Sequence, residues 1–133
     1  MGVIFDSSEI ISLERNRATV ESLVAGREDA PFGISVVTVA ELLHGVERAD
    51  TEARRLKRQA FVEKAIEIFP VFPFDLSVAR IYGRVWATLA KKGQTVGAHD
   101  LIIAATAISL DYTVVTANRR DFEKVEGLRL EVR

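Results

Sequence analysis

Val3-Ile4-Phe5-Asp6-Ser7-Ser8, near the start of the chain, is a short apolar run that ends in an acidic residue and two hydroxyl residues. Residues 2–5 have the apolar character of a buried β-strand. Asp6 and the two serines are residue types that cap helix N-termini, and apolar residues recur at helical spacing after them. The segment therefore predicts a buried strand that passes directly into a helix, with a carboxylate at the junction.

The same alternation of short apolar runs and helical patterns continues to the end of the chain. It predicts further strands at residues 33–37, 69–72, 113–115 and 128–132. It predicts further helices at residues 18–25, 38–47, 50–68, 76–92, 100–110 and 118–125. Strands separated by helices indicate an α/β fold, a short parallel sheet with helices on both faces in three α/β/α layers. In such sheets, sites form outside the carboxyl ends of the strands.

Local signals place several boundaries more sharply. Thr38 and Glu41 have the spacing of a capping box, which predicts that a helix opens there. Pro70 and Pro73 bound the third strand, so we expect it at an edge of the sheet. Asp75 is the expected N-cap of the following helix. The expected apolar sides of the helices at 50–68 and 76–92 are Ala53, Leu56, Ala60, Phe61 and Ala65, and Ala79, Tyr82, Trp86 and Leu89.

The composition fits one globular domain, residues 1–133, with 48% hydrophobic and 28% charged residues. The apolar run at 101–110 is too short to span a membrane, and the N-terminus lacks the basic segment of a signal peptide, so we expect a cytoplasmic protein. The absence of cysteine excludes disulfides, zinc–thiolate sites and thiol catalysis. The net charge of −1 does not favour a protein that coats nucleic acid, but it is compatible with a nuclease whose acids offset its basic residues.

Four carboxylates occupy related places on the predicted fold. Asp6 follows the first strand directly, Glu41 lies at the start of the helix after the second strand, and Asp121 follows the fourth strand by a few residues. Asp100 opens the apolar helix that precedes the fourth strand. Because sites in parallel sheets form at the carboxyl ends of the strands, we expect these four side chains to converge there.

Each of these acids, taken singly, also fits the start of a helix, where carboxylates are common. Taken together, four carboxylates at one edge repel one another and raise each other's pKa, and a hard divalent cation is the usual remedy. Mg²⁺ and Mn²⁺ prefer oxygen ligands, and a site that holds them can orient a phosphate and activate a water molecule. The cluster therefore suggests metal-dependent hydrolysis of a phosphodiester.

Four segments occur in a recognisable order and spacing across nearly the whole chain. They are VIFDSS at 3–8, SVVTVAEL at 35–42, VGAHDLIIAATA at 96–107 and VVTANRRDF at 114–122. Together they resemble the PIN-domain family and, within it, the VapC-type toxins of toxin–antitoxin pairs. The resemblance implies a parallel-sheet α/β fold and an endoribonuclease toxin that needs Mg²⁺ or Mn²⁺. It also implies a homodimer and neutralisation by a small VapB-like antitoxin.

The resemblance assigns roles to individual residues. The four acids of the family fall, in order, on Asp6, Glu41, Asp100 and Asp121. The three aspartates are expected to bind the metal ion directly or through its water shell, and Glu41 either holds a second ion or orients the attacking water. The polar residue after the fourth strand falls on Thr116, with Asn118 in the same loop. Thr116 or Ser7 is expected to hydrogen-bond a carboxylate or a water of the metal ion.

The family pattern is departed from at two positions, and histidines and arginines flank the acids. Ser7 stands where many members have threonine, and His99 stands where a small polar residue is common. His99 could act as a general base, although an ordinary loop residue is the simpler interpretation. His44 could lie near the mouth of the site, although a surface or interface residue is the simpler interpretation. Arg119 and Arg120, beside Asp121, are the expected contacts to RNA phosphates.

The helix at 50–68 has two interpretations beyond a plain core-facing helix. Its basic residues at 54–58 could contact RNA, although a solvated helix face is the simpler interpretation. Its amphipathic pattern also makes it a candidate wall of the groove that receives the antitoxin.

Other protein classes are alternatives to the PIN-nuclease interpretation. A phospho-receiver domain has a similar size and sheet, but it needs an acidic pair after the first strand and a lysine after the last. A haloacid dehalogenase-type hydrolase needs Asp-x-Asp where this chain has Asp6-Ser7-Ser8. A PIN domain that binds RNA or protein without catalysis, and a PIN nuclease outside any toxin–antitoxin pair, are the alternatives that the sequence leaves open.

Overall fold

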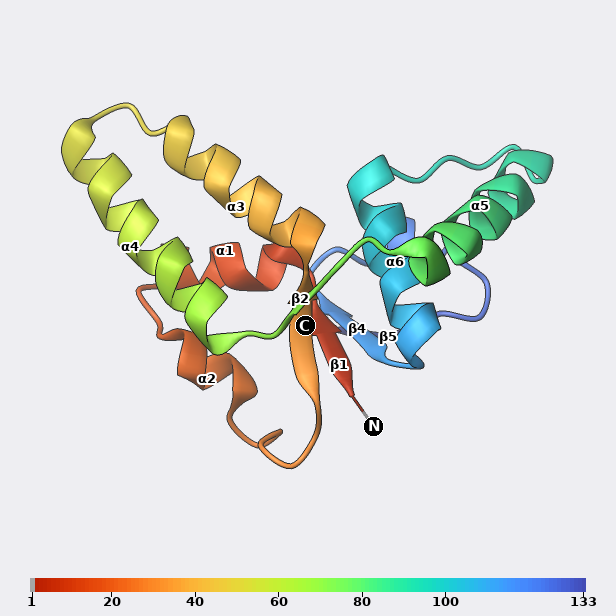
Figure 1. Cartoon of the computed structure of the whole chain (residues 1–133), viewed down its shortest axis with the longest axis horizontal. Coiled ribbons are helices and arrows are strands. Elements are labelled where there is room, and N and C mark those ends of the chain that lie inside the picture. Colours follow the sequence, from red (N-terminus) through yellow and green to blue (C-terminus); the bar gives the residue numbers. More distant parts are fainter. Residues whose placement is uncertain (1) are drawn as a thin grey trace.

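Strand β1 (Val3–Phe5) lies in the middle of a five-stranded sheet in the computed structural model, which describes residues 2–133 (Figure 1). The strand order is β3-β2-β1-β4-β5, and all neighbouring strands are parallel. The other strands are β2 (Phe32–Ser35), β3 (Val71–Phe72), β4 (Thr113–Thr116) and β5 (Arg129–Val132). Every residue of β1 is buried, because both faces of a central parallel strand are covered.

Helices cover both faces of this sheet, as the sequence predicts. They are α1 (Ser7–Arg15), α2 (Val20–Val24), α3 (Val36–Glu47), α4 (Glu52–Ile68), α5 (Leu76–Lys91), α6 (Ala98–Leu110) and α7 (Arg119–Phe122). Val3 and Phe5 pack in a core with residues of α1 to α4, whereas Ile4 points to the other face and packs in a second core with α6 and α7. The alternation of side chains along β1 thus builds a three-layer α/β/α fold, and the predicted fold class is confirmed.

Strand β3 is an edge strand, in agreement with the two prolines that bound it. It approaches β2 so closely that a side chain on Gly33 has no room. A Cβ atom placed there would lie 2.5 Å from the Phe72 ring and 2.6 Å from the carbonyl oxygen of Pro70. Glycine is therefore required at this position by packing between the two strands.

The junction between β2 and α3 differs from the prediction. The predicted strand at 33–37 ends at Ser35, and Val36 and Val37 already belong to α3. Ser35 is the N-cap, since its Oγ accepts the backbone N–H of Val37 at 3.1 Å, so the predicted capping box at Thr38 is wrong. The two valines favour a strand by their branched side chains, but the serine cap directs the chain into a helix.

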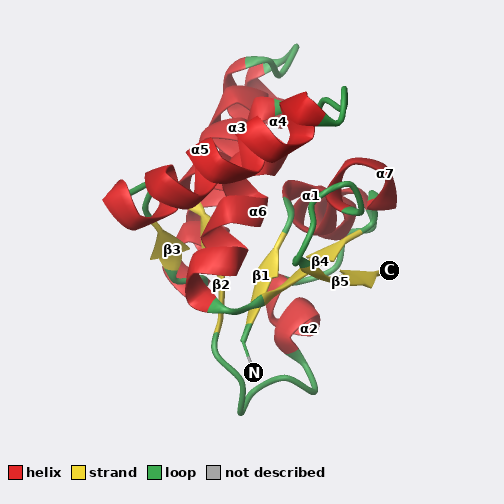
Figure 2. Cartoon of the chain, turned by 90° about the vertical axis from the view of Figure 1, so that its right-hand side faces the viewer, coloured by secondary structure: helices red, strands yellow, loops and turns green. Residues whose placement is uncertain are grey.

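Helices α3 and α4 form one pair and α5 and α6 another. Figure 1 and Figure 2 show the joined ends of α3 and α4 beyond the strands of the sheet. Much of α4 consequently faces solvent. Leu56 is 55% exposed, and the fully buried residues of this helix are Val62 and Ala65. The predicted apolar side is therefore wrong in its first half, because that part of the helix lies beyond the sheet that would have covered it.

Helix α5 begins as predicted, but its exposed face is more aromatic than expected. Asp75 Oδ1 accepts the backbone N–H of Val78 at 3.0 Å, which confirms the cap. Trp86, predicted to be in the apolar stripe, is 60% exposed and packs edge-on against Tyr82. Within residues 2–133, none of the helices combines the length and hydrophobicity that a bilayer crossing requires.

Candidate active site

The carboxylate of Asp6 is held at the carboxyl edge of the sheet by two hydroxyl groups. Asp6 lies directly after β1 and is only 3% exposed. Ser8 Oγ and Thr116 Oγ1 each donate to Asp6 Oδ2 at 2.8 Å. Ser8 lies in the first turn of α1 and Thr116 is the last residue of β4. Two elements, α1 and β4, therefore fix one carboxylate oxygen of the residue that follows β1.

Backbone amides fix the direction in which these two hydroxyls donate. The N–H of Ala117 donates to Ser8 Oγ at 3.1 Å, and the N–H of Asn118 donates to Thr116 Oγ1 at 2.9 Å. Each hydroxyl has a single proton, which the bond to Asp6 Oδ2 uses, so the 3.3 Å contact between the two hydroxyl oxygens has none of its own. The network therefore directs both hydroxyl protons at one oxygen of Asp6.

Ser7 connects Asp6 to Glu41. Its Oγ lies 3.5 Å from Asp6 Oδ1 and 3.4 Å from Glu41 Oε2, so its single proton bonds to one carboxylate at a time. Glu41 belongs to the second turn of α3, and helical side chains lean toward the N-terminus of their helix, which returns its carboxylate to the edge of the sheet. Burial raises the pKa of Glu41, and Glu41 Oε1 is buried with no hydrogen-bond partner.

Asp100, in the first turn of α6, is the carboxyl on which the charges of the other three acids act. Burial, together with the negative charges of Asp6, Asp121 and Glu41, raises the pKa of Asp100 to about 6. The four predicted acids are therefore brought together. His99 Nδ1 lies 3.8 Å from Glu41 Oε1, which is too long for a hydrogen bond, so this contact is electrostatic.

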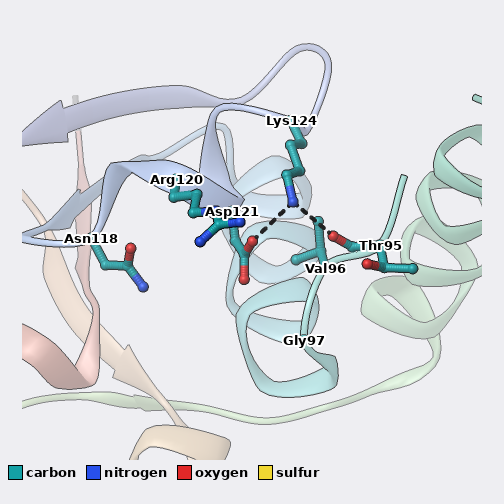
Figure 3. A pocket seen from close by; sticks show the side chains of 7 residues that line it. All are labelled: Thr95, Val96, Gly97, Asn118, Arg120, Asp121 and Lys124. Atoms are coloured by element: carbon teal, nitrogen blue, oxygen red, sulfur yellow. Dashed lines mark hydrogen bonds and ion pairs between the residues drawn. The ribbon is translucent and has the colours of Figure 1, made fainter. Parts of the chain in front are cut away.

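Asp121 is paired with a lysine on the same short segment. Lys124 Nζ lies 3.2 Å from Asp121 Oδ1 and also donates to the backbone oxygen of Thr95 at 3.1 Å (Figure 3). Asp121 and Lys124 line a pocket of about 590 Å³ together with residues 95–97, Asn118 and Arg120. The pocket therefore adjoins the acidic cluster on the side of Asp121.

The interpretation of these acids as helix caps fails at three positions. Asp6 precedes α1 but makes no side-chain cap bond, since its oxygens accept from hydroxyls instead. Glu41 is not the third residue of α3, because that helix begins before Thr38. Asn118 makes no side-chain bond that would complete a box with Asp121. Asp100 lies in the first turn of α6, and there its pKa is raised in spite of the helix dipole.

Two polar residues of the site were not predicted from the sequence. The motif around Ser8 indicates only a helix cap, and the bond of Ser8 to Asp6 depends on a backbone amide 109 residues further along the chain. Lys124 lies outside the sequence motifs described above. A lysine three residues after an acid on a predicted helix is a pattern that could have indicated the Asp121 pair.

The acidic cluster has the donors for a hard cation but is not a finished ligand cage. In the described part of the chain, no three carboxylate or imidazole groups are arranged so that they could hold a metal ion as they stand. Two observations nevertheless fit a cation. Glu41 Oε1 is buried without a donor, and the pKa of Asp100 is raised to about 6 by burial and by its acidic neighbours. All the donors are oxygens, which suits Mg²⁺ or Mn²⁺.

The basic residues near the site differ in whether their charge is paired with an acid. Arg119 lies 3.7 Å from Glu123 and points to solvent, whereas Arg120 lines the pocket and makes no salt bridge within residues 2–133. Within the basic cluster of α4, Arg54 pairs with Asp50, just before the helix, and Arg55 pairs with Glu52 in its first turn, as expected for a solvated face. His44, on α3, is exposed, as expected.

Comparison with known proteins identifies the family. The sequence matches the PIN domain over residues 3–128. The chain belongs to the PIN-domain family. Among curated members, it is 38% identical to ribonuclease VapC1 of Rickettsia felis over 98% of this chain and 95% of that protein. It is 40% identical to the tRNA(fMet)-specific endonuclease VapC of Salmonella typhimurium over 74% of this chain and 72% of that protein. The resemblance seen in the sequence is therefore confirmed.

Solved structures agree with this assignment. The DNA-bound VapBC of Salmonella typhimurium contains a chain that superimposes with a TM-score of 0.86 at 32% identity, covering 99% of this chain and 98% of that one. VapBC2 of Rickettsia felis, bound to a promoter fragment, gives a TM-score of 0.88 at 22% identity, covering 99% and 98%, and so shows the same fold. Membership of the PIN-domain family excludes the phospho-receiver and dehalogenase alternatives.

Proposed function

We propose that this PIN domain is a metal-dependent endoribonuclease of the VapC type, which acts as the toxin of a toxin–antitoxin pair. The observation that carries the proposal is the group of four acids at the carboxyl edge of the sheet, with Asp6 oriented by hydroxyls and Glu41 Oε1 left without a donor. The relatives named above are ribonucleases, and their structures are complexes of toxin with antitoxin.

Each acid has a distinct task in this proposal. Asp6, Asp100 and Asp121 hold Mg²⁺ or Mn²⁺, directly or through waters. When bound, the ion neutralises charge on the phosphate and favours ionisation of a nearby water. Asp6 is the most rigid ligand, because two hydroxyls fix its Oδ2 while Oδ1 has only the long contact to Ser7. Asp121 can hold the ion through Oδ1 only if Lys124 shares or releases that oxygen.

Glu41 is the residue suited to orient and deprotonate the attacking water. Its Oε1 has no hydrogen-bond donor, and its raised pKa makes it a better proton acceptor than an ordinary carboxylate. Ser7 and Thr116 support the reaction by holding the carboxylates. Arg120, which lines the adjoining pocket, supplies positive charge for the RNA backbone, whereas Arg119 is paired with Glu123. The alternative task for Glu41 is to hold a second ion.

The partner in this proposal is a VapB-like antitoxin. The relatives of known structure are VapBC assemblies, and this chain covers nearly the whole length of the toxin chain that it matches in them. The exposed side of α4 is the candidate wall of the groove for the antitoxin, because its first half has no cover in this chain. The toxin would form a homodimer and act in the cytoplasm, where RNA and antitoxin are made.

The test is cleavage of RNA by the protein after removal of any co-purified antitoxin. A mixed RNA pool and a transfer RNA fraction are incubated with Mg²⁺, Mn²⁺ or EDTA. The variants are Asp6→Asn and, as a matched control, Asp29→Asn, which changes an exposed acid outside the site. We expect metal-dependent cleavage that is lost in the first variant and kept in the second. Cleavage in EDTA, or full activity of folded Asp6→Asn, would refute the proposal.

A failure to cleave also has a defined meaning. If well-folded wild-type protein cuts no RNA with either metal, the enzyme assignment falls. The remaining reading is then a PIN domain that binds without catalysis. A calorimetric titration with Mg²⁺ alone distinguishes a nuclease from a binding-only domain, because it measures the affinity of the acidic cluster for the ion independently of the substrate.

A further inference from the structure

The pocket beside Asp121 combines groups that suit a single nucleotide. One wall is the backbone and side chains of residues 95–97, which lead into α6, and the other carries Asn118, Arg120, Asp121 and Lys124 (Figure 3). Its volume of about 590 Å³ is within the range of small-ligand sites. Figure 3 shows Asn118 apart from the contacts of Lys124 with Asp121 and Thr95.

Lys124 preforms this pocket. Its Nζ bonds to the backbone oxygen of Thr95 on one wall and to Asp121 Oδ1 on the other, at 3.1 and 3.2 Å. The lysine therefore joins the segment before α6 to α7. A pocket whose walls are already tied loses little conformational entropy when a ligand enters, which favours specific binding.

The chemistry of the lining selects among ligands. Arg120 has no salt bridge in the part of the chain that the structure describes, so its guanidinium can hold a phosphate or stack on a base. Asn118 offers both a donor and an acceptor, and Val96 gives an apolar surface. A nucleotide needs all three: a cation for the phosphate, paired polar groups for the base edge and a surface for the ring.

The pocket is connected to the acidic cluster through two residues. Asp121 belongs to both. The backbone N–H of Asn118 donates to Thr116 Oγ1, which in turn donates to Asp6. A chain of RNA whose phosphate lies at the acids therefore has its adjoining nucleotide next to the pocket. We expect an unpaired base to enter more readily, since a base in a duplex is held in the helix by stacking and pairing.

We propose that this pocket receives one unpaired nucleotide of the RNA substrate, adjacent to the bond that is cut, with Arg120 on its phosphate and Asn118 on its base. This inference rests on the proposed function, whose substrate it specifies. It makes a local single-stranded segment a requirement for cleavage, and it makes Asn118 a determinant of which base is accepted.

The neighbouring arginines provide a matched pair of variants. Arg119→Gln and Arg120→Gln remove the same charge from adjacent positions, but only Arg120 lines the pocket, whereas Arg119 is 67% exposed and pairs with Glu123. Binding is measured in EDTA by fluorescence anisotropy, with a labelled pool of single-stranded RNA decamers and the corresponding duplexes. Circular dichroism confirms that both variants are folded.

We expect Arg120→Gln to weaken binding of the single strand about tenfold and to lower the salt dependence by roughly one phosphate contact, while Arg119→Gln changes the affinity by less than about twofold. We expect duplex RNA to bind at least about tenfold more weakly than the single strand. Asn118→Ala should alter the ranking of oligo-A, oligo-C and oligo-U. Three results would overturn the proposal: equal effects of the two arginine variants on affinity, equal affinity for duplex and single-stranded RNA, or an unchanged ranking of the three homopolymers.

Cleavage by the wild-type protein in Mg²⁺ separates this inference from the proposed function. If the wild type cuts RNA but the two arginine variants bind RNA equally well, the proposal of a nucleotide pocket is refuted and the enzyme assignment stands. If Arg120→Gln selectively loses binding but the wild type cuts nothing, the pocket stands and the enzyme assignment fails.

Discussion

Replacement of Asp100 by asparagine is expected to stabilise the protein in the absence of metal while it abolishes cleavage. Asp100 lies among three other acids, and burial together with their charges raises its pKa to about 6 from an ordinary value of 3.8. The ionised form is therefore unfavourable in the folded protein at neutral pH. Asparagine has nearly the same shape but no charge, so the repulsion disappears.

The size of the effect follows from the pKa. A change from 3.8 to about 6 corresponds to at most about 3 kcal/mol of free energy of unfolding, since one pKa unit is worth about 1.4 kcal/mol. Asp100 is only partly buried, and water screens the repulsion, so we expect about 1–2 kcal/mol. For a chain of this size, that is a rise of about 4–7 °C in Tm.

The dependence on pH has a definite sign. Because the folded-state pKa lies above that of the unfolded chain, the carboxyl does not destabilise the protein below about pH 3.8, and the penalty grows as the pH rises to about 6. The advantage of Asp100→Asn should therefore be full at pH 7.5 and shrink steadily as the pH is lowered through 6 toward 4.

The assay is urea denaturation in EDTA at pH 7.5, 6 and 4.5, with Asp29→Asn as the control for loss of one exposed charge. Addition of Mg²⁺ should then stabilise the wild type more than Asp100→Asn, because the ion relieves the same repulsion. A variant that is less stable than the wild type at pH 7.5, or an advantage that does not change with pH, would refute this account of the cluster.

Three further predictions concern single contacts. Thr38 Oγ1 is buried without a partner, so Thr38→Val should raise the free energy of unfolding by about 1 kcal/mol. Thr106→Val should not raise it, because this change removes a 2.7 Å bond to the carbonyl oxygen of Ile102, and thermal melts compare the two variants directly. Ser8→Ala removes one of the two hydroxyls on Asp6 and should lower the cleavage rate about tenfold with little change in Tm, so an unchanged rate would contradict the orienting role. Gly33→Ala should destabilise the fold by about 1–3 kcal/mol in urea titrations, because its Cβ has no room beside β3.

The sequence predicts the order of strands and helices along the chain, because that order depends on local patterns. It also predicts that the four acids converge, because sites in parallel sheets form at the carboxyl ends of the strands. What it does not predict depends on distant partners. The orienting role of Ser8 requires Ala117 and Thr116, which are far away in the chain. Leu56 follows a regular helical pattern, but the helix extends past the core that would bury it.

The junction at Ser35 shows a different kind of limit. Branched side chains at Val36 and Val37 favour a strand, and a serine can end a strand or begin a helix. The local pattern contains both signals, and the cap bond from Val37 to Ser35 decides between them. Glu41 keeps its place at the site although the helix that carries it starts two residues earlier than predicted.

The direct passage from β2 into α3 has a mechanical consequence. Ser35 is the last residue of the strand and also the cap of the helix, so no loop separates Glu41 from the central sheet. Asp100, by contrast, stands behind the segment 92–97, which joins α5 to α6. When ions of different radius enter, we expect the first turn of α6 to shift and the Glu41 side to stay fixed. The site thus has one wall that is built directly into the sheet and one wall that follows a loop.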